Sequence, residues 1–388
     1  MIRRQFTQIA GTLAVAGLLA CAPAMAQEVV KIGYSGPLSG GAAQYGKNAL
    51  DGMKFAVDEL NGSAFEVGGK PVRFEVVALD DKYNPAETGI NFQRLVQEHK
   101  TPVVMTPHSG GIFAIQTKNM ATKTLLLAYS SVPEITARGN TLTLRIPPEF
   151  TSYLPAFVKH TMGTFGKKVA IASADHDYGK AWAKAFVPAW KAAGGEVVAE
   201  NPMSYNRATD FYSGVSKVLA AKPDVLFVGG ASEPTALVVK QARELGFKGG
   251  FIFIDQAKME QMKPILGGNY AMLEGSIGTL PLVDDVRPGT KAFVSSWYQA
   301  YPGREPGSEM SLNYTAMLAT AQAMKLAGST SDTAAIRAQL DKAFKTLKSS
   351  QNPHSMDGVD ARGGTLANTR VGVVEGGKIK EAAIASFK

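Results

Sequence analysis

Strand-like and helix-like segments alternate along most of this chain, and this alternation restricts its fold more than any other feature. Short apolar runs are separated by longer stretches with the apolar spacing of helices, first over residues 29–130 and again over 168–255. Alternation of this kind predicts parallel sheets with helices on both faces. The pattern stops at 141–150 and then restarts, so we expect two Rossmann-like α/β lobes. A chain of 388 residues is also too long for one hydrophobic core.

The alternation predicts the individual elements. Strands are expected at 29–34, 72–79, 103–106, 124–130, 168–173, 196–199, 225–229 and 251–255, and helices at 85–98, 110–122, 178–193, 210–220 and 233–245. Near 290–300, 309–327 and 332–347, three helix-like stretches follow one another without a strand. We expect these three to pack back on the first lobe. Residues 371–383 are typical of a hairpin around Gly376 and Gly377.

The order of these elements implies that the chain passes between the lobes three times. Extended crossings are expected near 146–149, 279–283 and 355–370, where proline, glycine or asparagine interrupts the pattern. We therefore assign residues 27–147 plus 282–356 to lobe 1, and residues 148–281 plus 357–388 to lobe 2.

The first unit of the fold has the form of a ligand site. A strand at Val29–Tyr34 leads into the glycine-containing loop 35–41, and the chain then continues as a helix to Asn61. Ligands of such units lie where the strand ends and the helix begins. Glycines let the backbone approach a bound group closely, and the helix start offers unpaired N–H groups. This stretch therefore predicts a site for a small molecule.

The first 26 residues have the pattern of an export signal. Arg3 and Arg4 precede the apolar segment Ile9–Ala20, and Ala24-Met25-Ala26 has the small residues of a cleavage site. We expect cleavage after Ala26 and a periplasmic mature protein. An alternative stays open, because Leu18-Leu19-Ala20-Cys21 also resembles a lipoprotein box that would place a lipid on Cys21.

Cleavage after Ala26 would leave 388 − 26 = 362 residues and no cysteine, because Cys21 is the single cysteine of the chain. Disulfides and catalytic thiols would then be excluded together. The net charge would fall from +8 to 39 − 33 = +6, with no block of lysines or arginines. This modest charge predicts an ordinary solvated surface and no nucleic-acid partner.

Five segments in order carry a family resemblance. They are KIGYSGPLSGGAAQYGKNALDGMKFAVDELN, LDDKYNPAET, LLLAYSSVPEITARG, SADHDYGKAW, and VLFVGG together with QARELGF. In these segments the chain resembles the periplasmic leucine/isoleucine/valine-binding proteins of ABC importers, over essentially the whole mature chain. The resemblance implies a type I periplasmic binding fold that closes on an amino acid or related molecule and presents it to membrane permease subunits. We expect a monomer that uses no cofactor.

The candidate ligand-binding residues follow predicted strands or begin predicted helices. They are Tyr45, Ser109, Ser130, Ser131, Tyr178 and Asp255. In the resembling family, the positions of the three serines bind the carboxylate and ammonium of the ligand, and the two tyrosine positions line the cleft. The position of Asp255 pairs with the α-ammonium through a charge-assisted hydrogen bond. The structural alternatives are a helix N-cap for Ser109, a hydrogen-bonded turn for the other serines, and plain packing for the tyrosines.

The chain departs from the family at three places. Asp255 stands where the family usually has glutamate, so the ammonium contact needs a closer ligand or a bridging water, or is lost. Ala231 and Ser232 replace a tyrosine pair, which suggests a larger or different ligand side chain. His108 and Tyr83 occupy positions where relatives often have a disulfide, which agrees with a mature chain free of cysteine and makes a rim role for His108 conceivable.

Enzyme motifs are absent or incomplete in this sequence. The segment Gly41–Asn48 is one residue short of a P-loop, because Asn48 lacks the hydroxyl that would bind Mg²⁺. The five histidines show no spacing typical of metal ligands, and no G-x-S-x-G elbow occurs. The neighbouring acids Asp80 and Asp81 resemble a catalytic pair, but the family keeps them for structure near the cleft. We therefore expect no enzyme and no metal site.

Two other functions stay open beside a receptor for branched-chain or related amino acids. The same fold would also suit an aromatic or other organic acid, or an amide, in view of Ala231, Ser232, Tyr45 and Tyr129. A periplasmic sensor module without a permease is the second alternative.

Overall fold

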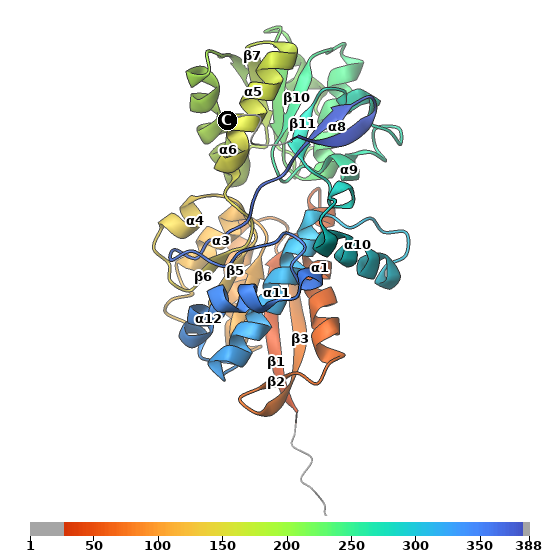
Figure 1. Cartoon of the computed structure of the whole chain (residues 1–388). Coiled ribbons are helices and arrows are strands. Elements are labelled where there is room, and N and C mark those ends of the chain that lie inside the picture. The colour runs from red at the N-terminus through yellow and green to blue at the C-terminus, as the bar shows by residue number, and fades with distance from the viewer. Residues whose placement is uncertain (1–26, 383–388) are drawn as a thin grey trace, which may run out of the picture.

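The structure is a computed structural model that describes residues 27–382 (Figure 1). The expected signal peptide, its cleavage site and Cys21 lie outside these described residues. Within the described part of the chain, none of the helices has the length and apolar character needed to cross a membrane.

The first sheet has six strands in the order β2-β3-β1-β4-β5-β6. Its strands are β1 (Glu28–Gly36), β2 (Glu66–Val67), β3 (Lys70–Asp80), β4 (Val103–Thr106), β5 (Leu125–Ala128) and β6 (Thr143–Arg145). All neighbours pair in parallel except β2, which is antiparallel to β3. The helices between these strands are α1 (Ala43–Asn61), α2 (Pro85–Gln97), α3 (Ser109–Gln116) and α4 (Glu134–Ala137).

The second sheet has seven strands in the order β13-β12-β11-β10-β9-β7-β8. Its strands are β7 (Lys168–Ser173), β8 (Glu196–Glu200), β9 (Val225–Gly229), β10 (Gly250–Phe253), β11 (Ile277–Thr279), β12 (Val371–Glu375) and β13 (Lys378–Ala382). Strand β12 is antiparallel to both β11 and β13, and the pairs among β7–β11 are parallel. The helices of this lobe are α5 (Leu154–Phe165), α6 (Asp177–Ala192), α7 (Tyr212–Leu219), α8 (Ser232–Glu244) and α9 (Met259–Met262), with the 3₁₀ turns η1 (Phe150–Tyr153) and η2 (Ala271–Leu273).

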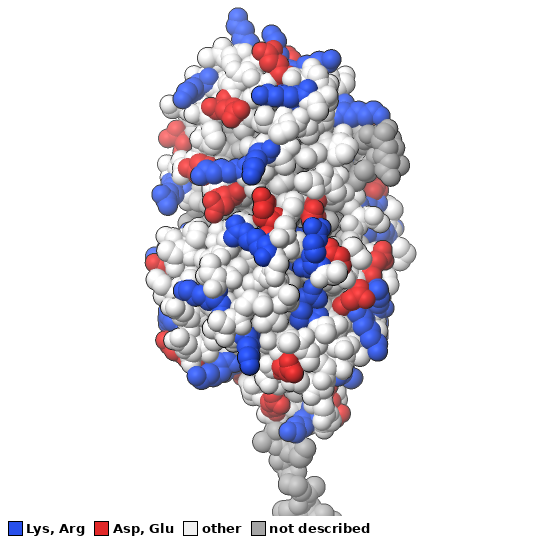
Figure 2. All heavy atoms as spheres, turned by 90° about the vertical axis from the view of Figure 1, so that its left-hand side faces the viewer, with Lys and Arg blue, Asp and Glu red and all other residues white. Residues whose placement is uncertain are grey.

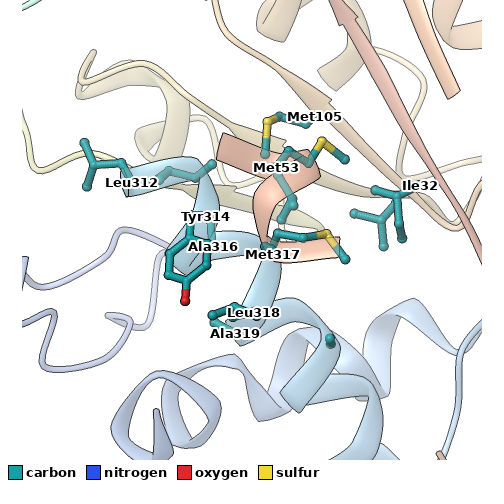
Figure 3. Packing of buried hydrophobic residues seen from close by; sticks show 14 of the residues in the cluster. Ile32, Met53, Met105, Leu312, Tyr314, Ala316, Met317, Leu318 and Ala319 are labelled. Carbon is teal, nitrogen blue, oxygen red and sulfur yellow. The ribbon is translucent and has the colours of Figure 1, made fainter. Parts of the chain in front are cut away.

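Three later helices return to the first sheet. They are α10 (Pro288–Ala300), α11 (Ser308–Ala327) and α12 (Thr333–Thr346), with the 3₁₀ turns η3 (Leu282–Asp284) and η4 (Ser349–Gln351). Met317 of α11 belongs to the same core as Ile32 of β1, Met53 of α1 and Met105 of β4 (Figure 3). Segments far apart in the sequence thus form one core, in which burial of apolar surface is the main stabilising contribution.

A glycine allows α1 and α11 to approach closely. A Cβ added at Gly52 of α1 would lie 2.1 Å from the carbonyl oxygen of Met310 in α11. No side chain fits this contact, so the residue at position 52 sets the distance between the two helices.

Two of the connections between the lobes are hydrogen-bonded to each other. The backbone N–H of Arg145 donates to the carbonyl of Gly363 at 2.8 Å, and the hydroxyl of Thr365 donates to the carbonyl of Ile146 at 2.6 Å. Figure 1 shows the later segment rising from the lower lobe to β12 in the upper one. These bonds fix the two segments side by side at the base of the space between the lobes.

Some elements differ from expectation. Helix α5 was not expected, because no element was assigned between the extended crossing near 146–149 and the strand at 168–173. Pro155 lies at the first positions of this helix, where its missing N–H costs no bond. Helix α3 ends at Gln116, earlier than expected, and β11 adds a short strand where only a crossing was expected.

Charged side chains of both signs are mixed over the surface face shown in Figure 2. Neither lysine and arginine nor aspartate and glutamate dominate this face. Such a mixture is typical of a solvated protein surface.

Candidate functional site

The first helix places an aromatic side chain between the lobes. Tyr45 lies in the first turn of α1, and its hydroxyl donates a 2.6 Å hydrogen bond to the carbonyl of Pro107. Its ring stacks on Tyr129, which follows β5, with 6.0 Å between the ring centroids. Burial raises the pKa of both phenols well above the usual value. Both tyrosines therefore keep their protons and form a fixed aromatic wall.

Three serines lie at the carboxyl ends of β4 and β5. The hydroxyl of Ser109 lies 2.9 Å from that of Ser130, so the two loops are joined at this point. Ser109 is the first residue of α3 and not its cap, because the preceding His108 accepts the N–H of Gly111 on Nδ1 at 3.1 Å. The N-cap alternative for Ser109 is therefore wrong, and its side chain is free for the contact with Ser130.

A chain of hydroxyl groups links the two lobes. The Ser131 hydroxyl lies 2.7 Å from the hydroxyl of Tyr178 in α6, and Tyr178 in turn donates to Oδ1 of Asp255, which follows β10. Burial, and then the charge of Asp255, raise the pKa of Tyr178 well above its usual value. Because Tyr178 has one proton and gives it to Asp255, Ser131 is the donor of the first bond.

The carboxylate of Asp255 keeps one oxygen open. Its Oδ1 also accepts the indole N–H of Trp182 at 3.1 Å, whereas no described residue donates to Oδ2. Asp255 is only 8% exposed. A buried carboxylate with an unused acceptor oxygen is able to receive a hydrogen bond from a ligand.

These residues surround one cavity between the lobes. Its wall includes Tyr45, Tyr129, Ser130, Ser131, Tyr153, Tyr178, Asp255, Lys258, Asp285, Arg287, Ser308, Leu312, His354 and Arg370. The space open to the centres of water molecules is about 70 Å³. Since one water needs roughly 10–15 Å³ of such space, the cavity has room for about five waters or one small organic molecule.

Five of the six candidate residues line this cavity. Ser109 does not line it, but lies behind Ser130 and faces an outer crevice of about 600 Å³ between the lobes. Ala231 and Ser232 are also not part of the cavity wall. Both are buried, and the Ser232 hydroxyl donates to Gln261 at 2.9 Å.

Comparison with known proteins identifies the family. The family described as periplasmic binding protein matches residues 29–378. The chain belongs to this family. The resemblance expected from the sequence is thus confirmed, and so is the type I fold, because solved periplasmic binding proteins have the same architecture.

Curated relatives of this periplasmic binding protein are distant. A Leu/Ile/Val-binding protein of Rhizobium johnstonii is 28% identical over 237 residues, which are 60% of this chain and 63% of that protein. The chain thus spans less than two thirds of that relative. The Leu/Ile/Val-binding protein of Escherichia coli is 25% identical over 298 residues, 74% of this chain and 78% of that protein.

Solved structures with the same fold contain different ligands. The branched-chain amino acid transporter substrate binding protein of Streptococcus pneumoniae, in complex with isoleucine, has a TM-score of 0.76 at 23% identity and covers 91% of this chain and 98% of that one. A solute binding protein of R. palustris, in complex with benzoate, has a TM-score of 0.78 at 18% identity and covers 92% and 96%. At these identities the likeness shows the fold alone.

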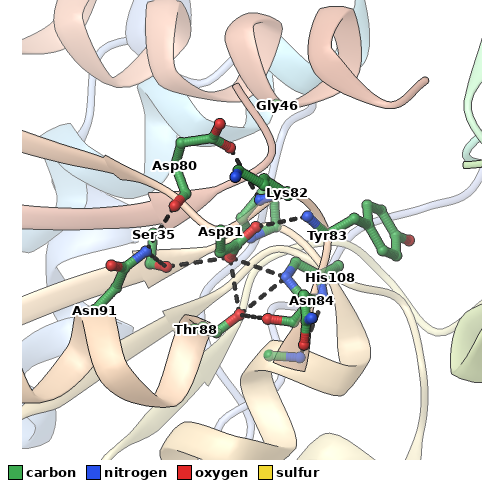
Figure 4. A network of polar contacts seen from close by, with 12 residues as sticks. Ser35, Gly46, Asp80, Asp81, Lys82, Tyr83, Asn84, Thr88, Asn91 and His108 are labelled. Atoms are coloured by element: carbon green, nitrogen blue, oxygen red, sulfur yellow. Dashed lines mark hydrogen bonds and ion pairs between the residues drawn. The ribbon is translucent and has the colours of Figure 1, made fainter. Parts of the chain in front are cut away.

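The acid pair of this periplasmic binding protein holds a strained turn at the cleft (Figure 4). Lys82 and Tyr83 both have positive φ, of 53° and 60°, a conformation that costs free energy in residues other than glycine. Asp80 accepts the N–H of Lys82, and Asp81 accepts the N–H of Tyr83, each at 2.9 Å. The pair therefore stabilises this turn.

Asp81 is also the centre of a buried network. Its Oδ2 accepts bonds from Ser35 at 3.1 Å and Thr88 at 2.8 Å, and lies 3.0 Å from Nε2 of His108. Because Nδ1 of His108 accepts a backbone N–H, its Nε2 carries the proton and donates to Asp81. These bonds connect β1, α2 and the start of α3 behind the cleft.

The strained turn brings Tyr83 across the gap between the lobes. Its ring stacks on that of His108 in the first lobe, with 4.5 Å between the centroids, and lies tilted against that of His176 in the second, with 4.9 Å between the centroids. Gln256 of the second lobe donates to its hydroxyl at 3.2 Å. Positions 83 and 108, which the resemblance relates to a disulfide, thus form an aromatic contact within the first lobe, and Tyr83 extends it to His176 of the second.

Sequence reasoning missed the charged part of the cavity. Asp285 accepts bonds from Arg287 at 2.6 Å and from Arg370, and these pairings lower the pKa of its carboxyl although burial opposes the shift. Arg370 comes from the crossing segment 85 positions later, so no local pattern indicates the pair. Lys258 was missed although it follows Asp255 by three positions, because nothing in its spacing shows that it points inward.

Proposed function

We propose that this protein is the substrate-binding component of an ABC importer that captures a branched-chain or related amino acid in the cavity between its lobes and presents it to membrane permease subunits. The contact chain from Ser131 through Tyr178 to Asp255 carries this proposal, because it places groups of both lobes around one enclosed space. The names of the curated relatives support the ligand class. Export to the periplasm by cleavage after Ala26 is part of the proposal.

The roles of the candidate residues follow from their chemistry. Ser130 presents its hydroxyl for the ligand carboxylate, with Ser109 holding it in place, and Ser131 supports the site through its hydrogen bond to Tyr178. The free Oδ2 of Asp255 accepts from the α-ammonium, and a bond between charged partners is stronger than a neutral one. The rings of Tyr45 and Tyr178 form walls of the space that holds the rest of the ligand. All six residues are thus assigned to binding or to its support.

Closure of the lobes is the mechanism of capture. We assign residues 27–147 plus 282–356 to one lobe and 148–281 plus 357–388 to the other, hinged at the three crossings. A ligand shifts a protein toward the closed form only through contacts that the open form lacks. Asp255 and Tyr178 belong to the second lobe, so they govern closure more than first encounter.

The second candidate ligand is an aromatic or other organic acid. The stacked pair of Tyr45 and Tyr129 favours it, because flat aromatic walls suit a flat ligand. The same fold holds isoleucine in one solved protein and benzoate in another, so the fold does not choose between the classes.

Calorimetric titration of wild type and Asp255→Ala tests the function. We expect wild type to bind L-leucine, L-isoleucine or L-valine with a Kd on the order of 1 μM, equivalent to roughly 8 kcal/mol. Asp255→Ala should weaken an amino acid greatly and an acid without an ammonium hardly at all. Equal losses for L-leucine and benzoate would remove the ammonium assignment, and binding of neither compound class would contradict the proposal.

A further inference from the structure

A lysine ammonium lies buried inside the cavity. Lys258 is only 4% exposed and forms part of the cavity wall, and its Nζ donates to the backbone carbonyl of Asp255. None of the ion pairs among residues 27–382 includes this lysine. A buried charge is costly unless it has an opposite charge or several hydrogen bonds. The ammonium therefore has donors to spare.

None of the acids around Lys258 among the described residues forms a direct ion pair with it. Asp255 uses Oδ1 for Tyr178 and Trp182, and Glu309 accepts both its bonds from Gln261. Burial raises the pKa of Glu260 to about 8 and also raises the pKa of Glu309. Glu260 is therefore mostly protonated and uncharged at neutral pH.

The remaining charges of the cavity wall pair among themselves. Asp285 binds both Arg287 and Arg370, and Arg370 also binds Glu381. The charged residues of the wall are the cations Lys258, Arg287 and Arg370 and the acids Asp255 and Asp285, so the net charge of the wall is 3 − 2 = +1. Among the described residues, Lys258 is thus the one of these three cations that forms no ion pair.

The backbone of Lys258 is held in place. Its N–H donates to the Ser232 hydroxyl at 3.0 Å, and the same hydroxyl donates to Gln261. Gln261 reaches Glu309 at the start of α11 in the other lobe. A cation fixed in this way is preorganised to bind an anion, since little ordering remains to be done on binding.

We propose that the Lys258 ammonium binds an anionic group of the ligand, so that the cavity selects carboxylic acids over their uncharged amides. This rests on the proposed function, because it requires the same cavity to hold the ligand. Ser130 takes the α-carboxylate of an amino acid, so within the proposed class of related amino acids the cavity favours those whose side chain carries a second carboxylate. For an organic acid without an ammonium, the group at Lys258 is the acid group itself.

Two matched pairs of compounds test this inference by calorimetric titration. L-glutamate and L-glutamine differ only in the charge of the side chain, and benzoate and benzamide differ in the same way. With wild type, we expect the acid of at least one pair to bind at least tenfold more tightly than its amide. In Lys258→Met, this preference should fall at least fivefold, while Lys258→Arg should keep most of it.

Controls separate binding from folding. Lys217→Met changes an exposed lysine of the same lobe and should leave the preference unchanged. Apo Lys258→Met should melt at the same temperature as wild type or higher, because a buried charge without a counter-ion is replaced by an apolar side chain of similar length. A lower melting temperature, with the acid preference intact, would assign Lys258 a structural role and overturn the inference.

The remaining outcomes distinguish the two proposals. Tight binding of L-leucine, with no preference for an acid in either pair, would contradict the role of Lys258 and leave the receptor function standing. Failure of L-leucine and all four paired compounds to bind would contradict the proposed ligand class, and with it the inference.

Discussion

The hydroxyl of Ser131 lies 2.7 Å from the hydroxyl of Tyr178, although the first belongs to the loop after β5 and the second to α6 of the opposite lobe. Tyr178 also donates to Asp255. Three residues from three separate segments thus form one continuous path of hydrogen bonds across the cavity.

Tyr178→Phe removes this path without changing the shape of the ring. A hydrogen bond to a charged group contributes about 1.5–3 kcal/mol, so ligand affinity should fall roughly tenfold to hundredfold. Titration calorimetry measures the change. Tyr212→Phe, at an exposed tyrosine of the same lobe, is the matched control, and equal affinities in both variants would show that the path does not contribute to binding.

Tyr83→Ala should weaken the contact between the lobes. The variant loses the two contacts of Tyr83 that cross between the lobes, to the ring of His176 and to the amide of Gln256, and a ring contact contributes about 0.5–1.5 kcal/mol. Small-angle X-ray scattering of the ligand-free protein should therefore show a larger radius of gyration than for wild type. A radius unchanged from that of the Tyr212→Ala control would contradict a role of Tyr83 in closure.

Asp81→Ala should strongly destabilise the first lobe. It leaves Ser35, Thr88 and His108 without their buried acceptor, and removing one partner of a buried pair costs about 3–5 kcal/mol. Urea unfolding gives the free energy of unfolding. Asp58→Ala, at an exposed position of α1, should change it by less than about 0.5 kcal/mol, and a similarly small effect for Asp81→Ala would contradict the account of the network.

Gly52→Ala should lower the free energy of unfolding by about 1–3 kcal/mol, because the added methyl group forces α1 away from Met310. Gly89→Ala is the matched control. Position 89 also lies in a helix, but a Cβ there meets no atom within 4 Å, so this change should be neutral or stabilise by about 0.4–1 kcal/mol. Equal effects of the two substitutions would contradict the close packing of α1 on α11.

Glu260 should make stability fall as pH rises. Burial raises its folded pKa from the usual 4.5 to about 8, and its Oε2 is buried without a hydrogen-bond partner among residues 27–382. Between pH 4.5 and 8 the folded state therefore binds more protons than the unfolded state, which makes the slope of stability with pH negative.

Urea unfolding at pH 5 and pH 8 measures this slope. Between pH 5 and pH 8 the free energy of unfolding of wild type should fall by on the order of 2–4 kcal/mol because of Glu260. In Glu260→Gln the fall should be smaller by this amount. Glu233→Gln, at an exposed position of α8, should behave as wild type. The same pH dependence in wild type and Glu260→Gln would contradict the assignment.

The sequence was sufficient to predict the two α/β lobes, the positions of most strands along the chain and the family. Each of these depends on local apolar periodicity or on short motifs, such as the strand, glycine loop and helix around Tyr45. Helix α5 was missed because the segment with Pro147 and Pro148 was interpreted as an extended crossing, and no element was assigned between it and the strand at Lys168. Pro155, in the unassigned stretch, lies at the start of this helix.

The charged part of the cavity had no signal in the sequence. Asp285 and Arg370 meet only because a late segment returns beside β11, and the inward position of Lys258 depends on its contact with Ser232. Long-range pairs of this kind follow from the packing of segments, whereas periodicity reports only on neighbours. The close approach at Gly52 was hidden for the same reason.

A crystal structure of the protein with the small molecule that co-purifies with it tests the central claim most directly. We predict density for that molecule in the cavity, with polar atoms within hydrogen-bond distance of Ser130 and Asp255 and an acid group near Lys258. Density in the outer crevice beside Ser109 and His176, or on a surface away from both lobes' facing loops, would contradict the account.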